Sequence, residues 1–186
     1  MDSATGMTFG ATIMFFFGAI WLLLGLYGGR PSPVSLRVGV LVAGMALAAG
    51  IGIMMRTTRQ YSDAPPPTAE QSRISRQTGK RFGWVTAIEG VAIFLAVVLL
   101  NAAHRPQSIA PVIALIVGLH FFPLASLFRR PVYYATGLLG CVIGIIGLLI
   151  SDPALCVSFV GLSFGSLLWL TVAAIVAVFV RASWGQ

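Results

Sequence analysis

Charged residues are scarce in this sequence of 186 residues. It has 5 acidic residues and 12 lysines and arginines, and only 9% of the chain is charged, compared with roughly 25% in an average soluble domain. Hydrophobic residues make up 58% of the chain. A soluble domain of this length needs more polar side chains than this to cover its surface, so the composition excludes an ordinary soluble domain.

Cysteine, lysine and histidine are also rare, which excludes several cofactor classes. Two cysteines, Cys141 and Cys156, cannot form a disulfide framework or a four-ligand zinc site. The only lysine, Lys80, lies in a polar stretch, so no apolar segment carries a retinal-binding lysine. His104 lies in a predicted loop, and His120 lies about 16 residues further along, deep toward the opposite side, so one haem cannot take both as axial ligands. We therefore expect neither a metal nor a cofactor.

Six long apolar segments account for most of the chain. Each has about the 20 residues that a helix needs to cross a bilayer core of roughly 30 Å. They cover residues 8–27, 38–55, 82–101, 108–128, 132–151 and 154–180. These segments predict an all-α integral membrane protein, in which residues 1–186 form one domain, a bundle of six transmembrane helices.

One polar stretch, residues 56–81, interrupts the apolar pattern. It contains three consecutive prolines, 65–67, and no apolar periodicity, so we expect one long loop. The stretch has six cations and two acidic residues, Asp63 and Glu70. Two interpretations fit this charge: a solvated linker, or a loop that binds anionic lipid headgroups.

The cations are distributed unequally between the two ends of the predicted helices. One end carries nine of them: Arg56, Arg59, Arg73, Arg76, Lys80, Arg81, Arg129, Arg130 and Arg181. The other end carries Arg30, Arg37 and Arg105. Because cytoplasmic loops retain Lys and Arg, this asymmetry predicts that both termini and the 56–81 loop are cytoplasmic. Cations in these positions orient helices, so we expect no nucleic-acid partner. The first apolar run is too long for a signal-peptide core, and we expect it to be retained.

Glu89 is the only formally charged side chain inside a predicted span. A carboxylate in hydrocarbon costs about 2.5 to 3.5 kcal/mol even on the most lenient scale, so such a residue normally faces the bundle interior. Thr86 is the only other polar residue within one turn of it. Two roles are compatible with this position: a proton or solute site, or a protonated carboxyl that hydrogen-bonds across a helix interface.

His120 is predicted to lie at the same depth as Glu89 on the next helix. Glu89 is seven residues, or about 10 Å, from the cytoplasmic end of its span, and His120 is eight residues, or about 12 Å, from that end of the adjacent span. Neither side chain has a sufficient polar partner on its own helix. We therefore expect the two to contact each other directly or through one water, because consecutive helices are usually neighbours.

Pro123 follows His120 by three residues and cannot donate a backbone hydrogen bond to the carbonyl of Leu119. A free carbonyl and a kink beside the imidazole would form either a binding notch or a purely structural bend. We include Thr86, Leu119 and Pro123 with Glu89 and His120 as a candidate substrate or proton pathway.

Glycines are spaced for close helix contact in the last two spans. Gly140 and Gly144 form one GxxxG motif, and Gly161 and Gly165 form another. These motifs fit packing within the chain or the seam of a homo-oligomer. The second span, 38–55, is also rich in Gly and Ala, and we expect it to be a packed central helix.

The segment GLHFFPLASLF at 118–128, followed by RRPVYYATG at 129–137, resembles a group of small uncharacterised bacterial multi-pass membrane proteins. Members of this group have a similar GLHF-P-LA helix that leads into a P-YY-TG segment. The resemblance implies a bacterial inner-membrane protein of about six helices. It singles out Glu89, His120, Pro123, Tyr133 and Tyr134. It implies no activity.

Two functions fit these features. The first is a small-solute or proton-linked transporter or channel that uses the Glu89 and His120 site. The second is a non-transporting scaffold, sensor or accessory protein in which the pair is structural. The sequence has no HExxH or P-loop motif, so we expect no catalytic residues, although an intramembrane hydrolase with this pair as acid and base is a further alternative.

Overall fold

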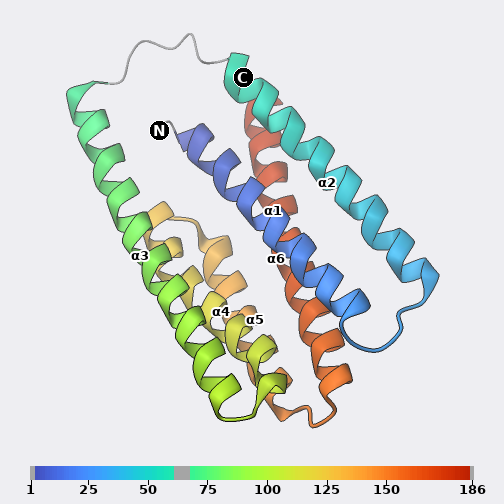
Figure 1. Cartoon of the computed structure of the whole chain (residues 1–186). Helices are drawn as coiled ribbons and strands as arrows, with labels where there is room; N and C mark the ends of the chain where they lie inside the picture. Colours follow the sequence, from blue (N-terminus) through green and yellow to red (C-terminus); the bar gives the residue numbers. More distant parts are fainter. Residues whose placement is uncertain (1–2, 61–67, 185–186) are drawn as a thin grey trace.

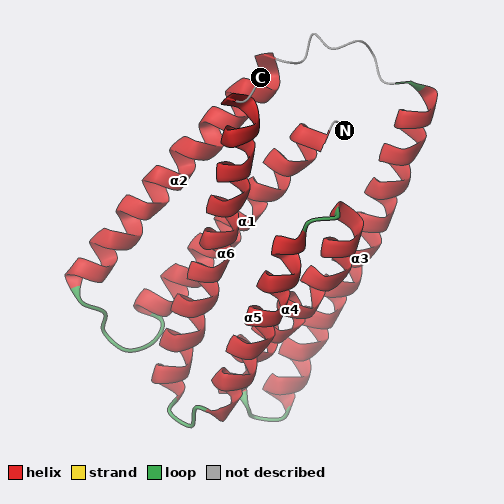
Figure 2. Ribbon diagram, turned by 180° about the vertical axis from the view of Figure 1, so that it is seen from behind, coloured by secondary structure: helices red, strands yellow, loops and turns green. Residues whose placement is uncertain are grey.

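The computed structural model describes residues 3–60 and 68–184, and every element in these ranges is helical (Figures 1 and 2). The elements are α1 (Ser3–Tyr27), α2 (Val34–Gln60), α3 (Ala69–Ala102), a short 3-10 helix (Pro106–Ser108), α4 (Ile109–Phe128), α5 (Pro131–Leu149) and α6 (Pro153–Trp184). Within the described residues, six helices are long and apolar enough to cross a membrane. The predicted six-helix, all-α architecture is therefore confirmed.

Two tightly packed helix pairs form the centre of the bundle. α1 lies along α6, and α4 lies along α5. α6 also contacts α2, α4 and α5, so it joins the two pairs. α2 lies at one edge and α3 at the opposite edge, as both views of the ribbon show (Figures 1 and 2). The most deeply buried large side chains include three on α6: Val160, Phe164 and Leu168.

Glycine permits the close approach of α1 and α6. A Cβ atom on Gly161 would lie 2.5 Å from the Cα atom of Gly25 and closer still to its backbone nitrogen. A Cβ atom on Gly165 would lie 2.8 Å from the carbonyl oxygen of Gly18. Any side chain at these positions would collide with backbone, so the two helices can touch only because these residues are glycines.

The GxxxG motif of α5, Gly140 and Gly144, lies at the interfaces of α5 with α4 and α6. A Cβ atom on Gly144 would lie 2.8 Å from the carbonyl oxygen of Pro111 on α4, and one on Gly140 would lie 2.9 Å from the ring of Phe164 on α6. Both GxxxG motifs thus face neighbouring helices of the same chain. These four glycines already pack against helices of the same chain, so they do not form the seam of a homo-oligomer.

α2 is not the central helix that its composition predicted. Among its hydrophobic residues only Ile51 and Met54 are buried, and a Cβ atom on Gly39 or Gly52 would meet nothing within 4 Å. Small side chains allow close helix contact but do not require it. The prediction failed because composition alone does not state which face of a helix meets a partner.

The polar stretch 56–81 is largely helical rather than one long loop. α2 continues to Gln60 and α3 begins at Ala69. Thr68 and Gln71 form a reciprocal capping box: the Thr68 side chain accepts from the Gln71 backbone at 3.2 Å, and the Thr68 backbone donates to the Gln71 side chain at 3.0 Å. This cap was a start signal in the sequence that the loop prediction missed. The three prolines, 65–67, lie outside the described residues.

At the end of the bundle opposite the start of α1 and the end of α6, Asp152 connects α6 to the segment between α1 and α2 (Figure 1). Its Oδ1 atom accepts hydrogen bonds from the backbone of Ala154 (2.9 Å) and Leu155 (3.1 Å), so it caps the first turn of α6. Its Oδ2 atom accepts a hydrogen bond from the guanidinium of Arg30. The backbone nitrogen of Arg30 also donates to Ser158 Oγ at 2.7 Å. The hydrogen bond from Arg30, supported by those from the α6 backbone, holds the pKa of Asp152 below its ordinary value.

This lowered pKa predicts a pH-dependent contribution to stability. Because the carboxylate is the favoured form in the fold, its contribution is present above the ordinary carboxyl pKa of about 4 and is lost as the pH falls through the lower folded value. Asp152→Asn keeps an oxygen for the helix cap but removes the charge. In thermal unfolding at pH 7 we expect the Asp152→Asn variant to have the lower Tm, and we expect the difference from the unmodified protein to shrink below about pH 4. A difference that is constant down to about pH 2 would contradict the prediction.

Candidate functional site

Glu89 on α3 and His120 on α4 face each other across the interface between these helices. The Nδ1 atom of His120 lies 3.4 Å from the Oε2 atom of Glu89. The side chains are 10% exposed for His120 and 18% exposed for Glu89, and the surrounding helices are apolar. The expected contact of the two residues is thus present in the structure.

The contact is an ion-pair distance rather than a completed hydrogen bond. His120 Nδ1 is buried and has no hydrogen-bond partner in the described part of the chain. A buried nitrogen without a partner is unfavourable, and a small movement of either side chain would complete a hydrogen bond to the carboxyl group. The imidazole also lies near the backbone of Val85, one turn before Glu89. A proton gained or lost by either group would therefore change the positions of the Glu89 and His120 side chains.

α3 positions Glu89 on the one face that it packs against the bundle. The half-buried residues of its apolar part follow a helical stripe that includes Phe82, Val85, Glu89, Ala92 and Ala96, and α3 has no fully buried residue. Its principal helix neighbour is α4. Within the apolar parts of these two helices, Glu89 and His120 are the only titratable side chains.

One aromatic ring contacts His120, and further ring contacts lie along the neighbouring helix interfaces. The Phe82 and Phe128 rings lie 6.0 Å apart at one end of the α3–α4 interface. The ring of His120 is perpendicular to that of Phe121, at 6.2 Å, and Phe121 in turn lies 5.8 Å from the ring of Tyr133 on α5. These apolar neighbours restrict water around the carboxyl and imidazole groups, which strengthens their electrostatic interaction.

The other three residues of the predicted pathway do not point into this contact. The side chains of Thr86 and Pro123 are exposed, and that of Leu119 is 59% exposed. The predicted contribution of Leu119 is its backbone carbonyl, and Pro123 lies within α4, which continues from Ile109 to Phe128. The sequence gives the depth of a residue in a span, but helix rotation places these three side chains toward the outside.

Two of the residues singled out by the sequence resemblance have different environments. Tyr133 is buried, whereas Tyr134 is 47% exposed. A further polar contact was missed at the sequence level: the hydroxyls of Thr136 on α5 and Thr171 on α6 lie 2.7 Å apart in the buried interface. The only available signal was a threonine in each of two apolar segments, which is too common to be informative.

The pair supplies too few ligands for a metal centre. Glu89 and His120 provide two donors, and in the described residues no group of three His, Cys, Asp or Glu side chains could hold a metal ion. Two hollows lie away from the pair: one of about 420 Å³ runs between α2 and α6, and one of about 220 Å³ lies near Arg105. The chemistry that this arrangement can perform is the binding and release of a proton.

Residues 78–180 match the model of a family of unknown function, DUF7010. The chain belongs to this family. The matched region contains most of α3 and all of α4 and α5, so it includes both members of the Glu89–His120 pair. No curated protein and no solved structure matches the chain. The family agrees with the resemblance to uncharacterised proteins and adds no activity.

Proposed function

We propose that this protein is a multi-pass protein of the bacterial inner membrane that uses the Glu89–His120 pair in proton-linked movement of a small solute. The proposal of membrane insertion rests on six sufficiently apolar helices and on the many apolar side chains exposed on α1, α2 and α3. Such a surface is unfavourable in water and favourable in lipid. The observation that carries the proton role is the 3.4 Å contact of a carboxyl and an imidazole in an otherwise apolar interface.

A proton added to or removed from this pair would change the packing of α3. An ionised carboxylate and an imidazolium attract each other, whereas a neutral pair is held only by a hydrogen bond between the two side chains. Because α3 lies at the edge of the bundle and packs mainly on α4, it can shift without disturbing the α1–α6 pair. Protonation would thus select between two positions of α3, which is the coupling that transport requires.

The test of this proposal is proton flux into liposomes that contain the purified full chain. With an imposed pH gradient and an internal pH-sensitive dye, we expect a flux above that of empty liposomes that is lost in Glu89→Gln. The matched control is Glu70→Gln, the same change at an exposed carboxylate on the polar part of α3, which should leave the flux unchanged. If Glu89→Gln and the unmodified protein conduct equally, the proton role is wrong.

A structural role is the second candidate, and one observation favours it. α3 has no fully buried residue, so the Glu89–His120 contact adds to the half-buried apolar contacts that hold this helix on the bundle. In that case the protein would be a scaffold, sensor or accessory protein, and substitutions of the pair would change stability without any flux to lose. Stability and flux measured on the same Glu89 variants therefore separate the two roles.

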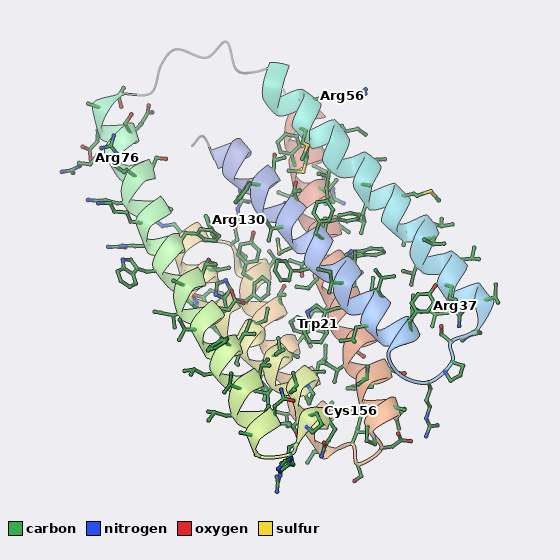
Figure 3. All side chains as sticks on the ribbon, in the orientation of Figure 1. Trp21, Arg37, Arg56, Arg76, Arg130 and Cys156 are labelled. Atoms are coloured by element: carbon green, nitrogen blue, oxygen red, sulfur yellow. The ribbon has the colours of Figure 1, made fainter. Side chains whose placement is uncertain are left out.

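The proposed orientation places both termini in the cytoplasm. Arg56 and Arg76 lie at the end of the bundle where α2 ends and α3 begins, whereas Arg37 lies at the opposite end (Figure 3). Because cations accumulate on the cytoplasmic side, the end with Arg56 and Arg76 should be inside, where this basic region would also meet anionic lipid headgroups.

Reporter fusions in a bacterial host test this orientation. We expect a reporter active only in the cytoplasm to be active when fused after Gln186 or inserted near Ala64, and a reporter active only in the periplasm to be active when inserted near Arg105. Periplasmic activity at Gln186 or Ala64 would show that the orientation is inverted or that a span has been miscounted.

A further inference from the structure

A groove between α2 and α6 has an unusual distribution of residues. It has a volume of about 420 Å³ and is open to the side of the bundle. Its lining residues are Ala46, Leu47 and Gly50 of α2 and Ala173, Val176, Ala177, Val180 and Arg181 of α6. All but the last are apolar and most are small, so the groove is an apolar surface with one cation in its lining.

The cation lies at one end of the groove. Arg181 is in the last turn of α6. The end of α2 lies beside the end of α6 (Figures 1 and 2). The described carboxylates are paired elsewhere: Glu70 with Arg73, Glu89 with His120, and Asp152 with Arg30. Arg181 therefore has no described carboxylate within ion-pair distance, and its charge is available to an external anion.

The length of the groove matches one leaflet of a bilayer. From Ala173 to Arg181 it extends over eight residues of α6, or about 12 Å along the helix axis. One leaflet of a hydrocarbon core of roughly 30 Å has a depth of about 15 Å. An acyl chain that lies in the groove would therefore place its phosphate at the level of Arg181.

The geometry points to a binding site for one anionic phospholipid, with an acyl chain between α2 and α6 and the phosphate bound to Arg181. The small side chains at Ala46, Gly50 and Ala177 leave room for the chain, and the arginine supplies charge complementarity for the headgroup. This inference rests on the proposed membrane insertion, but it is independent of the proton role of Glu89 and His120.

Native mass spectrometry of the purified full chain tests the site. The protein is incubated with phosphatidylglycerol or with phosphatidylcholine of identical acyl chains, and the lipid retained after removal of detergent is compared. We expect about fivefold greater retention of phosphatidylglycerol, which is the preference expected from one arginine near the headgroups. Arg181→Gln should remove this preference. Arg76→Gln, an exposed arginine at the same end of the bundle, should keep it.

A second pair of variants tests the apolar part of the groove. Ala177→Leu fills the groove and should reduce retention of both lipids severalfold, whereas Val178→Leu, on the exposed surface one residue further along α6, should not. Equal retention of the two lipids, or equal effects of Arg181→Gln and Arg76→Gln, would overturn the site. A dimer that excludes lipid would also overturn it, because a second copy would then cover the groove. If neither lipid is retained at all, the site is likewise overturned, whereas membrane insertion is tested separately by the reporter fusions.

Discussion

Gly161→Ala should separate α1 from α6 and produce a large loss of stability. The added Cβ atom would lie 2.5 Å from the Cα atom of Gly25 and closer still to its nitrogen, and both are backbone atoms that cannot rotate away. Overpacking of this kind costs about 1 to 3 kcal/mol, and more when helices must separate. Because van der Waals contact is a main source of helix association in lipid, the effect should extend along the whole α1–α6 pair. We expect a Tm several degrees lower in detergent.

The same substitution at Gly39 is the matched control. A Cβ atom there would meet nothing within 4 Å, and alanine is favoured over glycine inside a helix by roughly 0.5 to 1 kcal/mol. We therefore expect Gly39→Ala to leave the Tm unchanged or to raise it slightly. Gly140→Ala should have an intermediate effect, because its nearest neighbour is the end of the Phe164 side chain, which can move. Equal Tm values for the Gly161→Ala and Gly39→Ala variants would contradict the close contact of α1 and α6.

Glu89→Leu should destabilise the docking of α3, whereas Glu89→Gln should not. A glutamine has nearly the same shape, and its amide oxygen can accept a hydrogen bond from the His120 ring. A leucine removes the polar partner and leaves the buried imidazole uncompensated, which costs about 1 to 3 kcal/mol. We expect a clearly lower Tm for Glu89→Leu only, with Glu70→Leu as the control at an exposed carboxylate of the same helix.

Together with the flux assay, these variants separate the two proposed roles. If the pair carries protons, Glu89→Gln should lose flux while its Tm is unchanged, because an amide side chain does not ionise near neutral pH. A purely structural contact predicts that Glu89→Leu lowers the Tm and that no variant differs from the unmodified protein in flux. If Glu89→Gln lowers the Tm as much as Glu89→Leu, the stabilising interaction requires the charge and not the hydrogen bond.

Hydropathy and charge were sufficient to locate the helices. The predicted ends agree with the structure to within five residues everywhere except at the start of α3, where the polar residues 69–81 were assigned to a loop. That error has a local cause: periodic apolar residues are needed to recognise an amphipathic helix, and this part of α3 is polar on nearly all sides. The capping box at Thr68 and Gln71 was the signal that marks the true start.

The sequence by itself determined six apolar helices and the common depth of Glu89 and His120, because span length and residue depth depend only on position along the chain. Tertiary structure decided which helices are neighbours, that α2 lies at an edge, and that Thr86, Leu119 and Pro123 face outward. It also decided that Gly161 meets Gly25. These features depend on the rotation of each helix about its axis and on the fit of two surfaces, and in a chain that is apolar on nearly all sides the hydropathy pattern does not define either.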